Sequence, residues 1–485
     1  MSNQTSNQTL PARARQTSAT PARTAPPHRP GLALAIVLSC QLMLILDATV
    51  MNVALPRVQA DLGFTPAGLS WVMTSYSLTY GGLLLLGGRV GDIFGRRKVF
   101  IAGVALFTVA SLLGGFAPSA TWLIAARLLQ GVGAAAAGPS TVALITTTFT
   151  ETRERIRALA MLSAIASAGF AIGLILGGVL TQLVSWRWVL FINVPFGAAA
   201  VLLAPRYVKE PARHPARLDL PGAITATGGV AALVAGFTRA AEHGWSDRWT
   251  LLLLIAGAVL VAAFVAIQAT IREPMFPLRL LADRDRAAAY AIFLLGPAAM
   301  MSMFFFLTQF LQGVRGFDAL TTGLAFLPLA VAMFALTRVM ARILPRFGAR
   351  RLALTGIPLM ILGLLWLTRL EPSTGYFPGV FGPMLLMGLG VGLGFVPLTP
   401  TIMAAVPPQD AGAAGGAMQT MQQTGASLGI AVLVTVFGTA ARHAGERGSS
   451  TVDATLTGMT TAFAVAAVVA TVALLVATTF RRVRQ

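Results

Sequence analysis

Residues 42–56 of the chain read LMLILDATVMNVALP. This run belongs to a stretch long enough to cross a bilayer, because about 20 apolar residues span the ~30 Å hydrocarbon core as a helix. Asp47 stands within it, the one acid among 17 that lies well inside a predicted span. A carboxylate in hydrocarbon is costly and usually marks a functional site, although a structural hydrogen bond between helices is the alternative.

The composition of the whole chain indicates a polytopic helical membrane protein. Of 485 residues, 56% are hydrophobic and 11% are charged, whereas soluble domains carry about 25% charged residues. The single cysteine, Cys40, excludes an intrachain disulfide. The four histidines lie in the tail or in loops, which gives no sign of a metal site. The net charge of +19 does not predict nucleic-acid binding, because the basic residues are scattered over short loops.

Hydropathy predicts an all-α fold with fourteen transmembrane helices. Basic residues on cytoplasmic loops orient such proteins. With both termini in the cytoplasm, 27 of the 36 lysines and arginines fall on the inner side and 8 on the outer side. The remaining one, Arg127, lies within a span. The predicted spans are residues 31–55, 67–88, 99–117, 121–146, 157–184, 188–205, 219–238, 249–270, 287–311, 322–342, 350–369, 376–399, 413–438 and 456–480.

An internal repeat divides the chain into two halves. Residues 89–98 read RVGDIFGRRK and residues 342–351 read RILPRFGARR, with Gly103 and Gly356 in the same register. Transporters are commonly built from such repeats, with the binding site between them. The predicted parts are a disordered cytoplasmic tail (1–30), a six-helix bundle (31–205), a linker with two extra transmembrane helices (206–286), a second six-helix bundle (287–480) and a cytoplasmic C-terminus (481–485).

Several segments, in order along the chain, resemble motifs of the major facilitator superfamily. Residues 87–98, GGRVGDIFGRRK, resemble motif A, and residues 127–134, RLLQGVGA, resemble motif B. Residues 169–178, GFAIGLILGG, resemble the antiporter motif C. Residues 46–56 and residues 186–197, WRWVLFINVPFG, are similar to motifs of the fourteen-helix drug:proton antiporters. The resemblance covers residues 31 to about 480 and implies a fold of two six-helix bundles plus two inserted central helices.

The resemblance also implies roles for the motif residues. Motif A implies a conformational gate on the inner face, and its Asp92 stands among four cations with which it can form interhelical ion pairs. Leu174 stands where motif C normally has a proline, so plain helix packing is an equal interpretation of that motif. The gate residues are Gly88, Arg89, Gly91, Asp92, Gly95, Arg96 and Arg97, and the antiporter-motif residues are Gly169, Gly173, Gly177 and Gly178.

Asp47 and Arg127 are the two ions predicted inside the membrane. Asp47 lies about nine residues, or ~14 Å, from the outer end of its helix, and Arg127 lies about six residues, or ~9 Å, from the same side. We therefore expect them to face one cavity, paired directly or through water. Burial disfavours the charged carboxylate, whereas a nearby guanidinium favours it. That balance suits a proton-coupling site.

The predicted substrate cavity is apolar, with few polar groups. Methionine-rich and aromatic surfaces repack around varied ligands, although packing against lipid or neighbouring helices explains these residues equally well. The candidates are Asn52, Met300, Phe304, Gln309, Gln419, Gln422 and Gln423.

Together these features predict a proton-coupled exporter of hydrophobic or amphipathic small molecules such as drugs or antibiotics. It would need no cofactor and would lie in the bacterial plasma membrane, with the substrate, protons and the lipid bilayer as partners. A proton-coupled importer or symporter and a dedicated metabolite exporter are the alternatives. Neither the acid cluster nor the nucleophile–base set of a membrane enzyme is found, and the phosphate-binding motif of an ATP-driven pump is absent. We expect a monomer, and the sequence does not indicate whether a periplasmic adaptor takes part.

Overall fold

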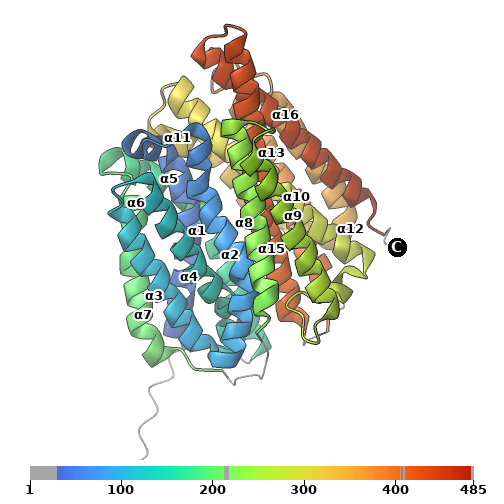
Figure 1. Cartoon of the computed structure of the whole chain (residues 1–485). Coiled ribbons are helices and arrows are strands. Elements are labelled where there is room, and N and C mark those ends of the chain that lie inside the picture. Colours follow the sequence, from blue (N-terminus) through green and yellow to red (C-terminus); the bar gives the residue numbers. More distant parts are fainter. Residues whose placement is uncertain (1–29, 150, 212–217, 405, 408–409, 482–485) are drawn as a thin grey trace, which may run out of the picture.

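The computed structural model describes residues 30–149, 151–211, 218–404, 406–407 and 410–481. Within these ranges the chain is helical and contains no strand (Figure 1). The predicted disordered tail, apart from Pro30, and residues 482–485 of the predicted C-terminus lie outside the described residues.

Each predicted span overlaps one or two helices, although residues 376–380 of the twelfth lie in the loop before α13. Eleven helices of the described chain are long and apolar enough to cross a membrane, and the count of fourteen stays a prediction. The first helices are α1 (Pro30–Leu62), α2 (Pro66–Phe94), α3 (Arg96–Gly115), α4 (Ala120–Thr148), α5 (Thr152–Leu183), α6 (Trp188–Phe191) and α7 (Asn193–Tyr207). The next are α8 (Leu220–His243), α9 (Arg248–Thr270) and a 3₁₀ turn (Leu278–Leu281). The last are α10 (Arg284–Gln309), a π-helical turn (Phe310–Val314), α11 (Ala319–Ala325), α12 (Leu327–Leu367), α13 (Phe381–Phe395), α14 (Leu398–Met403), α15 (Ala411–Glu446) and α16 (Thr451–Thr478).

Short polar side chains set where many helices begin. Each accepts a hydrogen bond from a backbone N–H of the first turn, which has no partner within the helix. Because most acids of the chain cap helices or stand in loops, they lie at the ends of the bundle. The capping residues are Thr65, Ser119, Asp219, Asp247, Asp283, Asp318 and Ser450.

The internal repeat is visible as two equivalent breaks in the helices. Gly95 separates α2 from α3 with φ +108°, and Gly348 has φ +73° within α12. Both follow a phenylalanine, and glycine adopts positive φ without the steric cost that other residues incur. Gly348 thus divides α12 into the two helices that correspond to the predicted spans 322–342 and 350–369.

The repeat also places one glycine contact in each half. A Cβ atom on Gly103 of α3 would lie 2.7 Å from the carbonyl oxygen of Gly133 on α4. A Cβ atom on Gly356 of α12 would lie 2.7 Å from the carbonyl oxygen of Gly390 on α13. Small residues let membrane helices approach closely. The third and fourth helices of each half therefore cross in the same way.

We expect Gly356→Ala to destabilise the protein by about 1–3 kcal/mol, because the added methyl group meets backbone atoms that cannot move aside. The nearest is the amide nitrogen of Gly394, at 2.4 Å. The thermal midpoint in detergent should fall. The control is Gly412→Ala on α15, where a Cβ atom would meet nothing within 4 Å. That midpoint should stay or rise slightly, and equal losses in both variants would contradict the packing argument.

Helices from the two halves of the chain pack side by side along two seams (Figure 1). Along one seam, Thr420 of α15 donates a hydrogen bond to the carbonyl oxygen of Gly81 on α2 at 3.1 Å. Along the other, a Cβ atom on Gly178 of α5 would lie 2.7 Å from the Cα atom of Leu320 on α11. Helix α8 packs against both α2 and α15, and so covers the first seam.

The loops gather at two ends of the bundle, as the alternation of the predicted spans requires. Residues 89–98, 279–286 and 342–351 belong to one end, here called the arginine-rich end. There Arg97 bonds to Glu210, and Arg89 donates to the carbonyl oxygen of Pro274. At the opposite end, Arg239 bonds to Asp247 at 2.6 Å, and this hydrogen bond lowers the pKa of Asp247 to about 2. Which end faces the cytoplasm stays a prediction.

Candidate functional site

Asp47 and Arg127 form an ion pair in the interior of the first bundle. Asp47 lies in the middle of α1 and Arg127 lies in α4, and both side chains are fully buried. Nη1 of the guanidinium donates to Oδ2 of the carboxylate. The predicted pairing of the two intramembrane charges is therefore confirmed, in its direct form. Buried charges are tolerated where they are paired and hydrogen-bonded.

Further contacts of the Arg127 side chain fix its orientation. Nε donates to the carbonyl oxygen of Val72 on α2 at 2.9 Å, and Nη1 also donates to Oε1 of Gln130 at 2.9 Å. The guanidinium carbon lies 4.6 Å from the centre of the Tyr76 ring, also on α2. A cation over an aromatic face is attracted by the ring quadrupole. α2 therefore holds the arginine toward α1.

Two amides complete the shell around the carboxylate. Nε2 of Gln130 donates to Oδ1 of Asp47 at 2.9 Å, and Nδ2 of Asn193 donates to the same oxygen at 3.0 Å. Ser111 of α3 accepts a hydrogen bond from Gln130 at 2.8 Å. Asp47 thus receives hydrogen bonds from one cation and two neutral amides.

The sequence reasoning missed both amides, although a signal existed for each. Gln130 follows Arg127 by three residues, which places the two on one face of α4. Asn193 lies five residues into the segment that starts at Trp188, about 8 Å along the helix. Counting residues from the same side of the membrane therefore places Asn193 at a depth similar to that of Arg127.

The glycines of motif C bring α5 against its neighbours. A Cβ atom on Gly173 would lie 1.9 Å from the Thr49 hydroxyl, and one on Gly177 would lie 3.0 Å from the Cα atom of Val50. Both contacts are with α1, within three residues of Asp47. Gly169 also faces α1, at Leu42. Gly178, the neighbour of Gly177 in sequence, faces α11 instead. The predicted close packing is confirmed, and a coupling role stays a prediction.

The motif A residues meet at the arginine-rich end. Asp92 of α2 pairs with Arg96 of α3 at 2.6 Å, the interhelical ion pair that the sequence predicted. A Cβ atom on Gly91 would meet the Arg96 side chain at 2.9 Å, and one on Gly95 would meet Glu210 at 2.7 Å. A Cβ atom on Gly88 would lie 3.8 Å from its nearest neighbour, the Cβ atom of Pro139. These contacts stabilise the turn between the helices, and the gate role stays a prediction.

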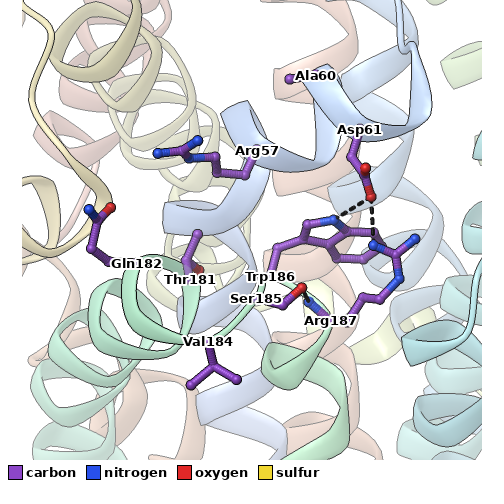
Figure 2. A pocket seen from close by; sticks show the side chains of 9 residues that line it. All are labelled: Arg57, Ala60, Asp61, Thr181, Gln182, Val184, Ser185, Trp186 and Arg187. Atoms are coloured by element: carbon purple, nitrogen blue, oxygen red, sulfur yellow. Dashed lines mark hydrogen bonds and ion pairs between the residues drawn. The ribbon is translucent and has the colours of Figure 1, made fainter.

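A polar hollow of ≈ 420 Å³ lies at the opposite end, between α1 and the loop that follows α5. Figure 2 shows its Asp61 pointing toward the side chains of Trp186 and Arg187. The indole nitrogen donates to this carboxylate at 2.9 Å and the guanidinium at 2.6 Å. Arg187 also donates to the carbonyl oxygen of Ala117. This clamp attaches the segment before α6 to α1 and to the loop that follows α3, upstream of Asn193.

Comparison with known proteins identifies the family. A sequence profile described as Major Facilitator Superfamily matches residues 37–430. This chain belongs to the major facilitator superfamily. This chain, called the facilitator below, is 41% identical over 430 residues to the puromycin resistance protein pur8 of Streptomyces alboniger, covering 87% of this chain and 85% of that protein. It is 42% identical over 412 residues to the cephamycin export protein CmcT of Amycolatopsis lactamdurans, covering 84% and 85%. A solved auto-inhibited POT family peptide transporter shares the fold, with a TM-score of 0.68 at 16% identity over 93% of this chain and 98% of that one.

Two of the predicted substrate residues, Asn52 and Phe304, are buried in contacts between helices. Asn52 is buried and accepts a hydrogen bond from Thr308 of α10 at 3.0 Å. Phe304 is buried between Phe170 and Phe326, with ring centres 5.5 and 4.9 Å away. Asn52 and Phe304 therefore take part in the packing between the two halves of the chain.

The other predicted substrate residues of the facilitator are partly buried. Gln309 lines a hollow of ≈ 280 Å³ at the opposite end. Gln419 and Gln423 of α15 face α2, where Gln419 hydrogen-bonds to Tyr80. Met300 and Gln422 complete the set. The described residues contain no group of three or more metal-ligating side chains. A role in substrate binding stays a prediction for all seven residues.

Proposed function

We propose that this facilitator is a proton-coupled secondary active exporter of hydrophobic or amphipathic small molecules of the drug or antibiotic type. The observation that carries the proposal is the buried ion pair of Asp47 and Arg127. Acids buried within membrane helices and paired with a cation mark proton relays, and a proton carrier requires such a titratable group. Relatives that share more than 40% identity are named as a puromycin resistance protein and a cephamycin export protein, which supports export of such compounds.

The same proposal includes the branch of the family and the mechanism of transport. The facilitator belongs to the fourteen-helix drug:proton antiporter branch, with two six-helix halves that alternate around a central site. Motif C contacts support this mechanism, because Gly173 packs on α1 close to Asp47 while Gly178 packs on α11 of the other half. It acts as a monomer in the bacterial plasma membrane with both termini in the cytoplasm, uses the proton gradient and needs no cofactor.

The first test measures protection against drugs. We expect a host lacking its own efflux pumps to tolerate higher concentrations of at least one apolar antibiotic when it expresses the full chain. The empty vector is the control, and a panel of antibiotics and dyes measures breadth. Resistance to a single compound would favour a dedicated metabolite exporter. A panel without any response, from protein shown to be in the membrane, would contradict drug export.

The second test measures direction. In inverted membrane vesicles, we expect the chosen substrate to accumulate inside when the interior is acidified, because protons leaving the interior exchange for it. A protonophore should abolish the accumulation. Uptake into intact cells driven by the same gradient would instead establish an importer or symporter.

A further inference from the structure

Asn193 makes a contact that packing alone does not explain. It is the first residue of α7, within the WRWVLFINVPFG segment, and its side chain is 1% exposed. Its amide nitrogen points at two groups, Oδ1 of Asp47 at 3.0 Å and the hydroxyl of Ser111 at 3.5 Å. Its amide oxygen accepts no hydrogen bond within the described residues. The side chain therefore uses its donor, and only its donor, on the carboxylate site.

This pattern differs from that of a structural asparagine. Buried amides usually satisfy both of their polar atoms, because a buried atom without a partner costs free energy. Gln130 follows that rule, since its oxygen accepts from Arg127 and its nitrogen donates to Asp47 and Ser111. Asn193 leaves its oxygen unsatisfied and still directs its nitrogen to Asp47. A neutral donor there favours the charged form of the acid over the protonated form.

Gln130 donates to the same oxygen of Asp47, and few ionisable groups of the described chain surround this acid. Arg127 of α4 and Tyr76 of α2 are the ionisable side chains that interact with Asp47, and Tyr76 interacts in turn with Tyr80 of α2 and Cys40 of α1. α3 and α7 contribute the uncharged Ser111 and Asn193. α5 and α10 also contact α1, but their ionisable residues lie within their first seven positions, near the arginine-rich end.

We propose that Asn193 is a positioning residue that sets the pH at which Asp47 exchanges its proton. It shares Oδ1 of the carboxylate with Gln130 while Arg127 holds Oδ2, so the acid is held between α4 and α7. The inference rests on the proposed proton-coupled function. It assigns to the start of α7 a direct part in proton coupling.

The test is a titration of the acid itself in the full-length protein. Infrared difference spectroscopy in lipid nanodiscs follows the carbonyl band of the protonated carboxylic acid across pH, and Asp47→Asn identifies the band. For Asn193→Leu we expect the midpoint to move to higher pH by about one to two units, the effect of losing one hydrogen bond to a charged group. Asn193→Ala should move it in the same direction, and serves if the leucine variant does not fold.

A matched control is Asn52→Leu. Asn52 is a second buried asparagine, on α1 itself, and its partner is Thr308 rather than Asp47. Its substitution should leave the midpoint in place. An equal shift in Asn52→Leu would overturn the inference, because any lost amide would then act alike. The pH profile of substrate efflux should move with the midpoint in the Asn193 variants.

The outcomes separate the two proposals. If Asp47→Asn removes the band and the Asn193 variants keep the wild-type midpoint, the inference about Asn193 fails and Asp47 remains the proton carrier. If no carboxylic acid band is sensitive to Asp47→Asn, the proposed carrier fails, and the role of Asn193 fails with it. A band that belongs to Asp47 and shifts only in the Asn193 variants supports both.

Discussion

Asp47→Asn is expected to abolish proton-driven transport while leaving the protein folded. Asparagine matches the size of the carboxylate, and its amide oxygen can still accept the hydrogen bond of Arg127, whereas Gln130 and Asn193 then meet an amide nitrogen and lose their acceptor. It cannot bind and release a proton. In proteoliposomes with an imposed pH gradient, substrate movement should fall to the level of empty vesicles, whereas exchange of substrate for substrate without a gradient should persist.

The matched control for this variant is Asp61→Asn. Asp61 stands on the same helix, but at the opposite end, where it binds Trp186 and Arg187 (Figure 2). Its neutral variant should keep the proton dependence of transport. Asp47→Glu, which retains a titratable group, should keep part of the activity. Full gradient-driven transport by a correctly folded Asp47→Asn protein would exclude Asp47 as the carrier.

The pairing at this site was predictable because depth in a membrane helix follows from residue counting. A rise of 1.5 Å per residue placed Asp47 and Arg127 at a similar depth. Because an unpaired buried charge is costly, the two were expected to pair. Asn193 was not predicted, because a neutral amide carries no comparable penalty that marks it in the sequence. Its contact also depends on which helices are neighbours, and α7 meets α1 only through the tertiary fold.

The predicted substrate residues show a limit of prediction from residue patterns. In a membrane protein, apolar side chains face lipid, the core and a cavity alike, so composition does not separate the three environments. The sequence around Phe304 was compatible with a cavity wall, and it is equally compatible with the aromatic contacts that Phe304 makes with Phe170 and Phe326. The glycines were different, because each close approach admits only a residue without a side chain. Gly95 and Gly348, which repeat in sequence, therefore repeat in structure as helix breaks.

Arg127→Leu is expected to destabilise the protein more than any other substitution at the site. It removes the cation from a carboxylate that is fully buried. Breaking one side of a buried ion pair costs about 3–5 kcal/mol, because the remaining charge loses its compensation. The change also removes the bond to the carbonyl oxygen of Val72 and the contact with the Tyr76 ring. A large fall in the thermal midpoint and in the yield of folded protein should follow.

The double variant Asp47→Asn with Arg127→Leu separates these causes. It has no charge at the site, so it should be more stable than Arg127→Leu alone, although both lack the contacts with α2. Arg127→Lys keeps a charge but has a single nitrogen for the three acceptors that the guanidinium serves on Asp47, Val72 and Gln130. Its stability should therefore fall between wild type and Arg127→Leu. If the double variant is no more stable than Arg127→Leu, the loss comes from the α2 contacts, and the buried charge of Asp47 does not dominate the energetics of the site.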